Sequence, residues 1–194
     1  LGIRNIMALR GDPPQGQAVF APAEGGFAHA NDLVRLVKSL HPDVDVGVAG
    51  YPECHPESPD AGADIARLKE KVDAGADFVT TQLFYDTDAF LRFRERAVAA
   101  GVKVPVLAGL MPPTSLKGVE KAVALSRVKV PDALKRSLAE ADDPEDAGMA
   151  WCEAQIVRLA REGVAGVHLY ILNRARALLH PRLVRALARL RGRG

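Results

Sequence analysis

Short apolar runs alternate with amphipathic helical patterns along the chain, and no other feature limits its fold as strongly. Five of the runs suit a strand, and each ends in polar or turn-forming residues. Repeated strand–helix units build a parallel sheet, so the sequence predicts an α/β fold. The predicted strands are residues 5–9, 44–50, 78–83, 104–110 and 166–172.

Helical periodicity fills the stretches between the predicted strands. Asp64 is predicted to cap the N-terminus of its helix, and Gly75 and Gly101 stand just after two helix ends, where glycine is favoured. The acidic string of residues 140–146 offers a metal no partner ligands, so we interpret it as a solvated loop and predict no metal site. The predicted helices are residues 29–40, 64–74, 87–100, 115–126, 131–141 and 147–161.

Composition narrows the classes of function. The 194 residues include 26 basic and 24 acidic side chains, and this net charge of +2 gives no reason to expect a nucleic-acid partner. The basic residues after position 181 alternate with leucines, as in a solvated amphipathic helix. Cys54 and Cys152 lack the spacing of a zinc site or a disulfide framework, which fits a reducing cytoplasm. No apolar run is long enough to cross a membrane.

The number of strands decides between two kinds of α/β fold. Five parallel strands can form an open sheet, whereas a (β/α)₈ TIM barrel needs eight. The chain begins at Leu1, without an initiator methionine or a polar lead-in. We therefore expect residues 1–194 to form a single domain comprising about the last five βα units of an incomplete barrel, with about three units preceding it.

Polar side chains follow most of the predicted strands at the point where each strand ends. Because the carboxyl ends of parallel strands meet at one rim, residues distant in the sequence can share a single ligand there. These side chains are Arg10 and Asp12 after the first strand, Tyr51, Glu53 and His55 after the second, Gln82 and Asp86 near the third, and Asn173 and Arg174 after the fifth.

Several of these residues also have an ordinary structural interpretation. His55 can be a loop histidine held by a carboxylate, and Asp12 can cap the turn before Pro13. Lys71, late in its helix, can be a solvated side chain. Gln82 is harder to explain in this way, because a buried amide needs hydrogen-bond partners. The chain has no glycine-rich phosphate loop of the GxGxxG or Walker type, so a nucleotide would be held differently.

Five segments of the chain match a known family in order and with near-constant spacing. They are ALRGDPP, YPECHPES, the predicted helix over residues 64–71 with the following VDAGAD, TTQLFYD and LYILNRA. Each segment alone is a weak indicator of the family, but the ordered series of five is highly specific for it and covers essentially the whole chain. On these segments the sequence resembles methylenetetrahydrofolate reductase.

The resemblance implies a barrel with non-covalent FAD, which takes a hydride from NADH or NADPH and passes it to 5,10-methylenetetrahydrofolate. The product, 5-methyltetrahydrofolate, supplies methyl groups for methionine synthesis. The implied protein is a cytoplasmic flavoprotein oxidoreductase of one-carbon metabolism with a small-molecule substrate. The sequence leaves open the choice between the two nicotinamide cofactors and the oligomeric state, a homo-oligomer included.

Carried over residue by residue, the resemblance assigns the ligand contacts. Asp12 is the implied catalytic residue, because a carboxylate near the flavin ring disfavours the anionic reduced flavin. Lys71, Arg10 and His55 are implied to balance the pyrophosphate charge. The implied folate contacts are Asp12, Gln82 and Arg174. The implied FAD contacts are Arg10, Gly11, Asp12, His29, Ala30, Tyr51, His55, Ser58, Asp64, Arg67, Glu70 and Lys71.

Some positions depart from the family pattern. His29 stands where a tyrosine is common, Gly118 where some members carry a folate-contacting glutamine, and Ala122 where some carry an aromatic residue beside the nicotinamide. The family's general acid, a glutamate near its amino terminus, has no counterpart in these residues. Flavin reduction needs no proton delivery to the folate, so we expect it to survive in the isolated chain, whereas folate reduction is impaired.

Two other functions stay open on the sequence. The chain can be a non-catalytic fragment or interaction subunit, because an incomplete barrel exposes the edges of its first and last strands. It can also be another barrel enzyme that acts on a phosphorylated metabolite. FAD absorbance in the purified protein separates the reductase from this last alternative.

Overall fold

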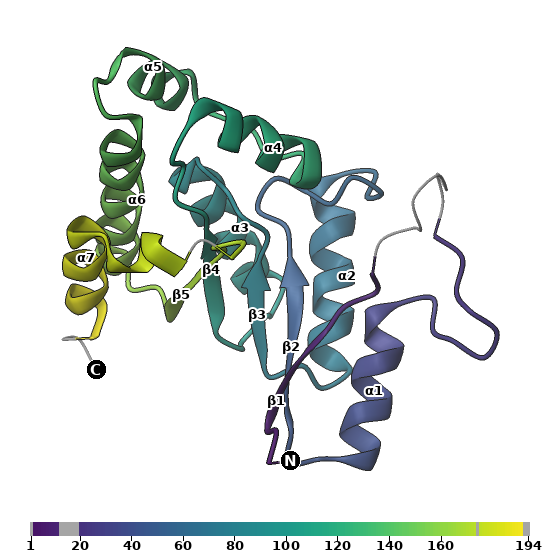
Figure 1. Cartoon of the computed structure of the whole chain (residues 1–194). Coiled ribbons are helices and arrows are strands. Elements are labelled where there is room, and N and C mark those ends of the chain that lie inside the picture. The colour runs from purple at the N-terminus through teal and green to yellow at the C-terminus, as the bar shows by residue number, and fades with distance from the viewer. Residues whose placement is uncertain (1, 12–19, 174, 192–194) are drawn as a thin grey trace.

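The strands form one parallel sheet in the order in which they occur in the chain (Figure 1). The structure, a computed structural model, describes residues 2–11, 20–173 and 175–191. Consecutive order without a switch point is the arrangement of a TIM barrel rather than of a doubly wound sheet. The predicted α/β class is therefore confirmed, and the sheet is consistent with part of such a barrel. The strands are β1 (Asn5–Ala8), β2 (Asp45–Gly50), β3 (Phe78–Thr81), β4 (Val106–Leu110) and β5 (Gly166–Leu169).

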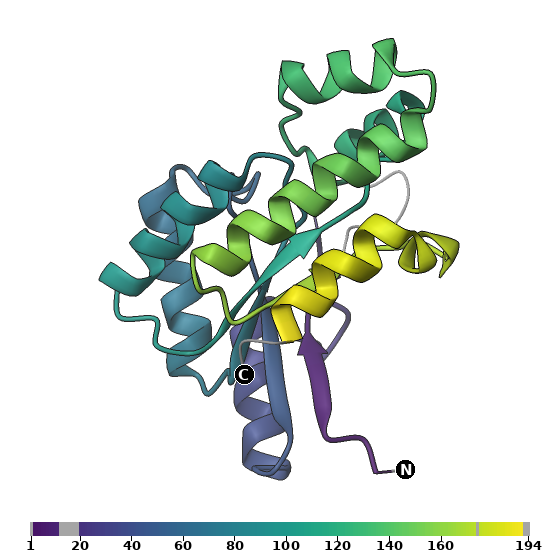
Figure 2. The same ribbon diagram turned by 90° about the vertical axis from the view of Figure 1, so that its left-hand side faces the viewer.

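All six predicted helices are present in the connections between the strands. The first three helices each fill one connection, whereas the next three all lie between β4 and β5. Of these three, α4 and α5 stand beyond the carboxyl ends of the strands, and α6 returns along the sheet (Figures 1 and 2). The helices are α1 (Ala30–Leu40), α2 (Ala61–Asp73), α3 (Thr87–Ala99), α4 (Leu116–Ser126), α5 (Asp132–Glu140), α6 (Pro144–Arg161) and α7 (Pro181–Arg191), with a 3₁₀ turn (Ala175–Leu179) before α7.

Apolar side chains fill the interior around the central strands. Val46, Val48 and Val79 have no exposed surface, and the same holds for Ala108 and Leu110. They belong to one hydrophobic cluster that also contains side chains of α2, α3, α6 and α7. Because unpaired polar groups are excluded from such a core, they gather where the strands end.

Three strands end earlier than predicted: β1 ends one residue early, at Ala8, and β3 and β5 end two and three residues early. β3 ends at Thr81 rather than at residue 83, because the backbone N–H of Leu83 donates to the side-chain Oε1 of Gln82. β5 ends at Leu169 rather than at residue 172, where Leu172 and Asn173 adopt positive φ angles of 42° and 64° that strand residues do not take. Gln82 therefore lies just beyond its strand, on the side where ligands bind in this class of fold.

The predicted cap of the second helix was wrong. Asp60, not Asp64, caps α2, since its Oδ1 accepts a hydrogen bond of 2.8 Å from the backbone N–H of Ala63. The sequence analysis placed the start of the helix too late, because residues 61–63 read Ala-Gly-Ala and carry no hydrophobic pattern that marks a helix. Asp64 lies inside the first turn, 8% exposed, and its carboxylate is available to other partners.

The acidic string of residues 140–146 is only in part a loop. Asp143 caps α6 by accepting hydrogen bonds from the backbone N–H groups of Glu145 and Asp146, and Pro144 occupies the first turn. Asp146 then accepts two hydrogen bonds, of 2.8 and 2.9 Å, from the guanidinium of Arg182. Its carboxylate therefore ties α7 to α6 instead of facing solvent alone.

The predicted amphipathic C-terminal helix is confirmed as α7. Leu183 and Ala186 are buried against the core, while Arg185 and Arg189 are exposed. None of the described helices combines the length and the apolar character that crossing a membrane requires.

Candidate functional site

The loop after β2 and the following helix bring six of the predicted FAD contacts together. We call Tyr51, His55, Ser58, Asp64, Arg67 and Lys71 the β2–α2 cluster. Lys71 is its most buried cation: Nζ donates a hydrogen bond of 2.7 Å to the carbonyl of Ala49 and lies 6.0 Å from the centre of the Tyr51 ring. Burial lowers the pKa of Lys71, and the negative charge of Asp64 opposes that shift. A cation is thus held beside the carboxyl end of β2, as anion binding requires.

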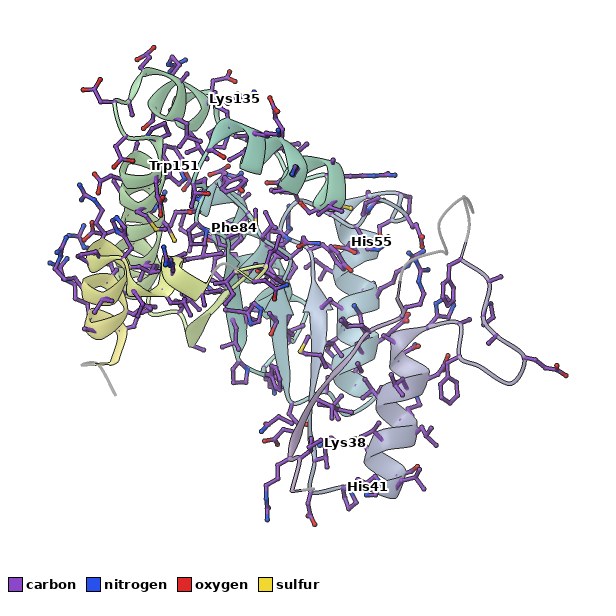
Figure 3. The ribbon with its side chains drawn as sticks, viewed as in Figure 1. Lys38, His41, His55, Phe84, Lys135 and Trp151 are labelled. Atoms are coloured by element: carbon purple, nitrogen blue, oxygen red, sulfur yellow. The ribbon has the colours of Figure 1, made fainter. Side chains whose placement is uncertain are left out.

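His55 lies in the loop near the N-terminal end of α2 (Figure 3). Its ring meets the ring of Tyr51 edge to face, with centroids 4.5 Å apart. Nδ1 accepts a hydrogen bond of 3.1 Å from the backbone N–H of Glu57, so in the neutral imidazole the proton is on Nε2. Burial lowers the pKa of His55, which favours this neutral form. The loop therefore presents a hydrogen-bond donor rather than a full charge.

A side-chain relay anchors the loop to the start of α2. The hydroxyl of Ser58 donates to Oδ1 of Asp64 at 3.1 Å, and Nη1 of Arg67 donates to the same hydroxyl oxygen at 3.4 Å. The buried carboxylate is thereby paired, and the exposed guanidinium is turned toward the loop.

Arg10 joins this region from β1 through a partner that the sequence analysis did not identify. Its guanidinium donates two hydrogen bonds, of 2.8 and 2.7 Å, to the carboxylate of Glu57, and its Cζ lies 4.8 Å from the centre of the Phe20 ring. This bond from Arg10 lowers the pKa of Glu57. Glu57 thus pairs with Arg10, and it contacts His55 only through its backbone. Gly11 follows with a φ of 71°, a conformation that glycine adopts readily.

Gln82 lines a small cavity together with Tyr51 and Pro52. Its Oε1 accepts the bond from Leu83, and its backbone N–H donates to the carbonyl of Gly50 at 2.8 Å. The amide is therefore oriented by its own backbone, which leaves Nε2 as the donor for a ligand.

A second network that the sequence analysis missed fixes the residue before Gln82. The hydroxyl of Tyr170 donates to the carbonyl of Thr81 at 2.9 Å, and Oγ1 of Thr81 accepts from the backbone N–H of Gly109 at 2.9 Å. A Cβ at Gly109 would stand 2.1 Å from that carbonyl oxygen. A glycine inside the apolar run of β4 was the available signal, since it often marks a close backbone approach.

The remaining predicted contacts are not part of the β2–α2 cluster. Asp12 and Arg174 lie outside the described residues. His29 precedes α1 without a side-chain cap, Ala30 is the first residue of that helix, and Glu70 is exposed on α2. Among the described residues, His29 and Glu70 have no side-chain hydrogen bond or ion pair with the cluster. Within the same residues, no three His, Cys, Asp or Glu side chains are grouped so as to hold a metal ion.

The arrangement can hold a phosphate-bearing group. Arg67 and Lys71 supply positive charge, Arg10 shares its charge with Glu57, and neutral His55 supplies a donor. Anions bound without a glycine-rich loop need such cations, and guanidinium groups match phosphate oxygens well.

Comparison with known proteins gives a consistent result. The sequence model of the methylenetetrahydrofolate reductase family matches residues 1–181. The 5,10-methylenetetrahydrofolate reductase of Pectobacterium carotovorum is 42% identical over 180 residues, which cover 90% of this chain and 57% of that protein. That of Escherichia coli is 40% identical over 178 residues, 90% of this chain and 58% of the relative. Methylenetetrahydrofolate reductase (NADH) 1 of Arabidopsis thaliana is 40% identical over 186 residues, which cover 89% of this chain and 31% of that protein.

The chain therefore spans less than two thirds of the length of these relatives. A solved structure from Clostridium thermocellum, an uncharacterized protein that binds two copies of 5-methyl-5,6,7,8-tetrahydrofolic acid, superposes with a TM-score of 0.61 over 92% of this chain and 66% of that one. At 18% identity this likeness concerns the fold alone. The match over residues 1–181, together with the series of rim residues, shows that the chain belongs to the methylenetetrahydrofolate reductase family.

Proposed function

We propose that this chain forms the flavin-binding part of an enzyme that reduces 5,10-methylenetetrahydrofolate to 5-methyltetrahydrofolate for methionine synthesis. NADH or NADPH is the reductant, and FAD carries the hydride between the two substrates. The observation that supports the proposal best is the β2–α2 cluster, in which buried Lys71, neutral His55 and the Ser58–Asp64 pair adjoin the end of one strand. The names of the curated relatives support the reaction.

The chain's own residues bind and orient the cofactor in this proposal. Bound FAD supplies the hydride chemistry, accepting a hydride from the nicotinamide and passing it to the folate. Lys71, Arg67 and Arg10 balance the pyrophosphate charge, and Nε2 of His55 donates to an oxygen of the cofactor. Tyr51 offers its ring as an apolar contact. His29, Ala30, Gly11 and Glu70 stay proposed FAD contacts on the resemblance.

Folate binding is assigned to the ends of β1, β3 and β5. Gln82 donates from Nε2 to the pterin edge, and the Tyr170–Thr81 hydrogen bond holds the backbone just before it. Asp12 and Arg174 are proposed folate contacts on the resemblance alone, and Asp12 also tunes the flavin. The folate-type ligand of the Clostridium thermocellum structure supports this class of substrate for the fold.

The test is the visible spectrum of the purified chain after FAD addition and desalting, followed by anaerobic NADH and NADPH in turn. We expect the retained flavin absorbance to bleach with a nicotinamide cofactor, and folate-dependent reoxidation to be slow because the family's general acid has no counterpart here. Loss of all flavin on desalting would contradict cofactor binding by this chain and would favour the non-catalytic interaction subunit. Retention of flavin without bleaching would contradict the hydride relay alone.

A further inference from the structure

A cavity of about 770 Å³ lies between α3 and α6, and we call it the α3–α6 cavity. The loop after β2 and the link from α4 to α5 close it on the other sides. None of the residues assigned above to FAD or folate lines it. Its volume falls within the range of about 300–1,000 Å³ that small-molecule sites occupy. The chain therefore holds a space of ligand size apart from the residues assigned to FAD and folate.

Unpaired polar atoms are concentrated in the wall of this cavity. In the described part of the chain, Oη of Tyr85, Oε1 of Gln155 and Oε1 of Glu53 are buried and have no hydrogen-bond partner. Tyr85 is 1% exposed and Gln155 4%. Burial raises the pKa of Tyr85 and that of Glu53, so the hydroxyl stays protonated and the carboxylate is disfavoured. Buried polar groups are usually paired, so three unpaired atoms just behind the cavity lining are an uncommon concentration.

The cavity also has an apolar side and uncommitted cations. Trp151, Val130 and Pro131 line it, and Nε1 of Trp151 donates to the carbonyl of Tyr85, which fixes the indole ring in the wall (Figure 3). Within the described residues, Arg96 and Lys129 form no ion pair with any carboxylate. The other lining cations are paired, Arg92 with Asp86 and Arg158 with Asp88.

We propose that the α3–α6 cavity binds a small aromatic carboxylate. The ring lies against Trp151 and Pro131, and the carboxylate is attracted to Arg96 and Lys129. Charge complementarity favours an anion over a neutral ligand, because neither Arg96 nor Lys129 forms an ion pair with a carboxylate among the described residues.

The chain contains one tryptophan, Trp151, so its fluorescence reports on this cavity. The probe is 3-bromo-5-hydroxybenzoate, whose bromine quenches indole fluorescence at contact, and its uncharged amide is the matched ligand. N-acetyltryptophanamide, titrated in parallel, corrects for absorption and collisional quenching. We expect saturable quenching by the acid and about tenfold weaker binding of the amide, as loss of a charge-assisted hydrogen bond predicts.

Variants decide whether the binding uses this cavity. Arg96→Gln with Lys129→Gln is expected to weaken the acid about tenfold and to leave the amide unchanged. Arg94→Gln on the same helix is the matched control, because Arg94 donates to the carbonyl of Glu162 outside the cavity. Ala154→Phe, at an exposed lining position, is expected to block both ligands.

Two results would overturn the proposal. One is quenching of the wild-type chain that does not saturate and that equals the quenching of N-acetyltryptophanamide. The other is equal binding of acid and amide that the double substitution does not change. FAD retention involves other residues. A cavity that binds no aromatic carboxylate would therefore leave the proposed function standing, and a chain that retains no FAD would leave the cavity proposal standing.

Discussion

The β2–α2 cluster and the α3–α6 cavity flank the same loop but differ in how their polar groups are satisfied. In the cluster, Ser58, Asp64 and Lys71 bond one another or the backbone. In the cavity wall, Tyr85 and Gln155 each retain an unpaired oxygen. The first region is preorganised and keeps its shape without a ligand, whereas the second has polar groups that are left to be satisfied. Four experiments test this difference and the packing around it.

Gly148→Ala should have the largest effect. A Cβ there would stand 1.5 Å from the carbonyl oxygen of Pro113, so α6 must move away from the link after β4. We expect a loss of about 3 kcal/mol in the free energy of unfolding, measured by denaturant titration. Gly62→Ala in α2, where a Cβ would meet only the side chain of Asp60 at 3.1 Å, is the control and should be close to neutral. Equal stability of both variants would show that close packing of Gly148 against Pro113 does not hold α6 in place.

Lys71→Met should weaken FAD retention by about tenfold or more, because a partly buried cation is removed from the proposed phosphate site. The measurement is a fluorescence titration of the chain with FAD. Lys69→Met on the same helix is the matched control, since Lys69 pairs with Asp73 at the surface. Equal FAD affinity in the two variants would remove the cluster from the cofactor site.

Two tyrosines, the buried Tyr85 and the half-buried Tyr170, test the difference in polar satisfaction directly. Tyr170→Phe removes the hydroxyl that bonds Thr81 and should cost about 1 kcal/mol of unfolding free energy. Tyr85→Phe removes a hydroxyl without a described partner and should cost nothing or stabilise the chain slightly. Thermal or urea unfolding of the pair checks this. A larger loss at Tyr85 than at Tyr170 would reverse our description of the two regions.

The smallest effect concerns pH. Burial lowers the pKa of His55 from the ordinary value of 6.5, so the unfolded chain binds protons more readily than the folded one. This contribution to stability is complete above pH 6.5 and declines as the pH falls toward the folded-state pKa. It should stay below about 1 kcal/mol because water screens the loop. The free energies of unfolding of the wild type and of His55→Gln should converge as the pH is lowered. For the control His41→Gln, at an exposed position, the difference from the wild type should not change with pH.

The sequence predicted the fold well, whereas the roles of the site residues stay predictions. Strand and helix positions followed from hydrophobic period, and one rim motif correctly grouped Tyr51 with His55. The Asp60 cap was missed because Ala-Gly-Ala has no pattern, and the Glu57 partner of Arg10 was missed because 47 residues separate them. The α3–α6 cavity was not predictable either, since it exists only where two helices and a distant link meet. Asp12 and Arg174 stay predictions.

The Arg10–Glu57 ion pair has a consequence for local opening. In the described residues β1 pairs with β2 alone, and only Ala8 of β1 is buried. The ion pair joins the segment after β1 to the loop after β2, and ions in solution weaken such a surface contact. Amide protons of β1 should exchange with deuterium sooner than those of β3, and added salt should widen that gap.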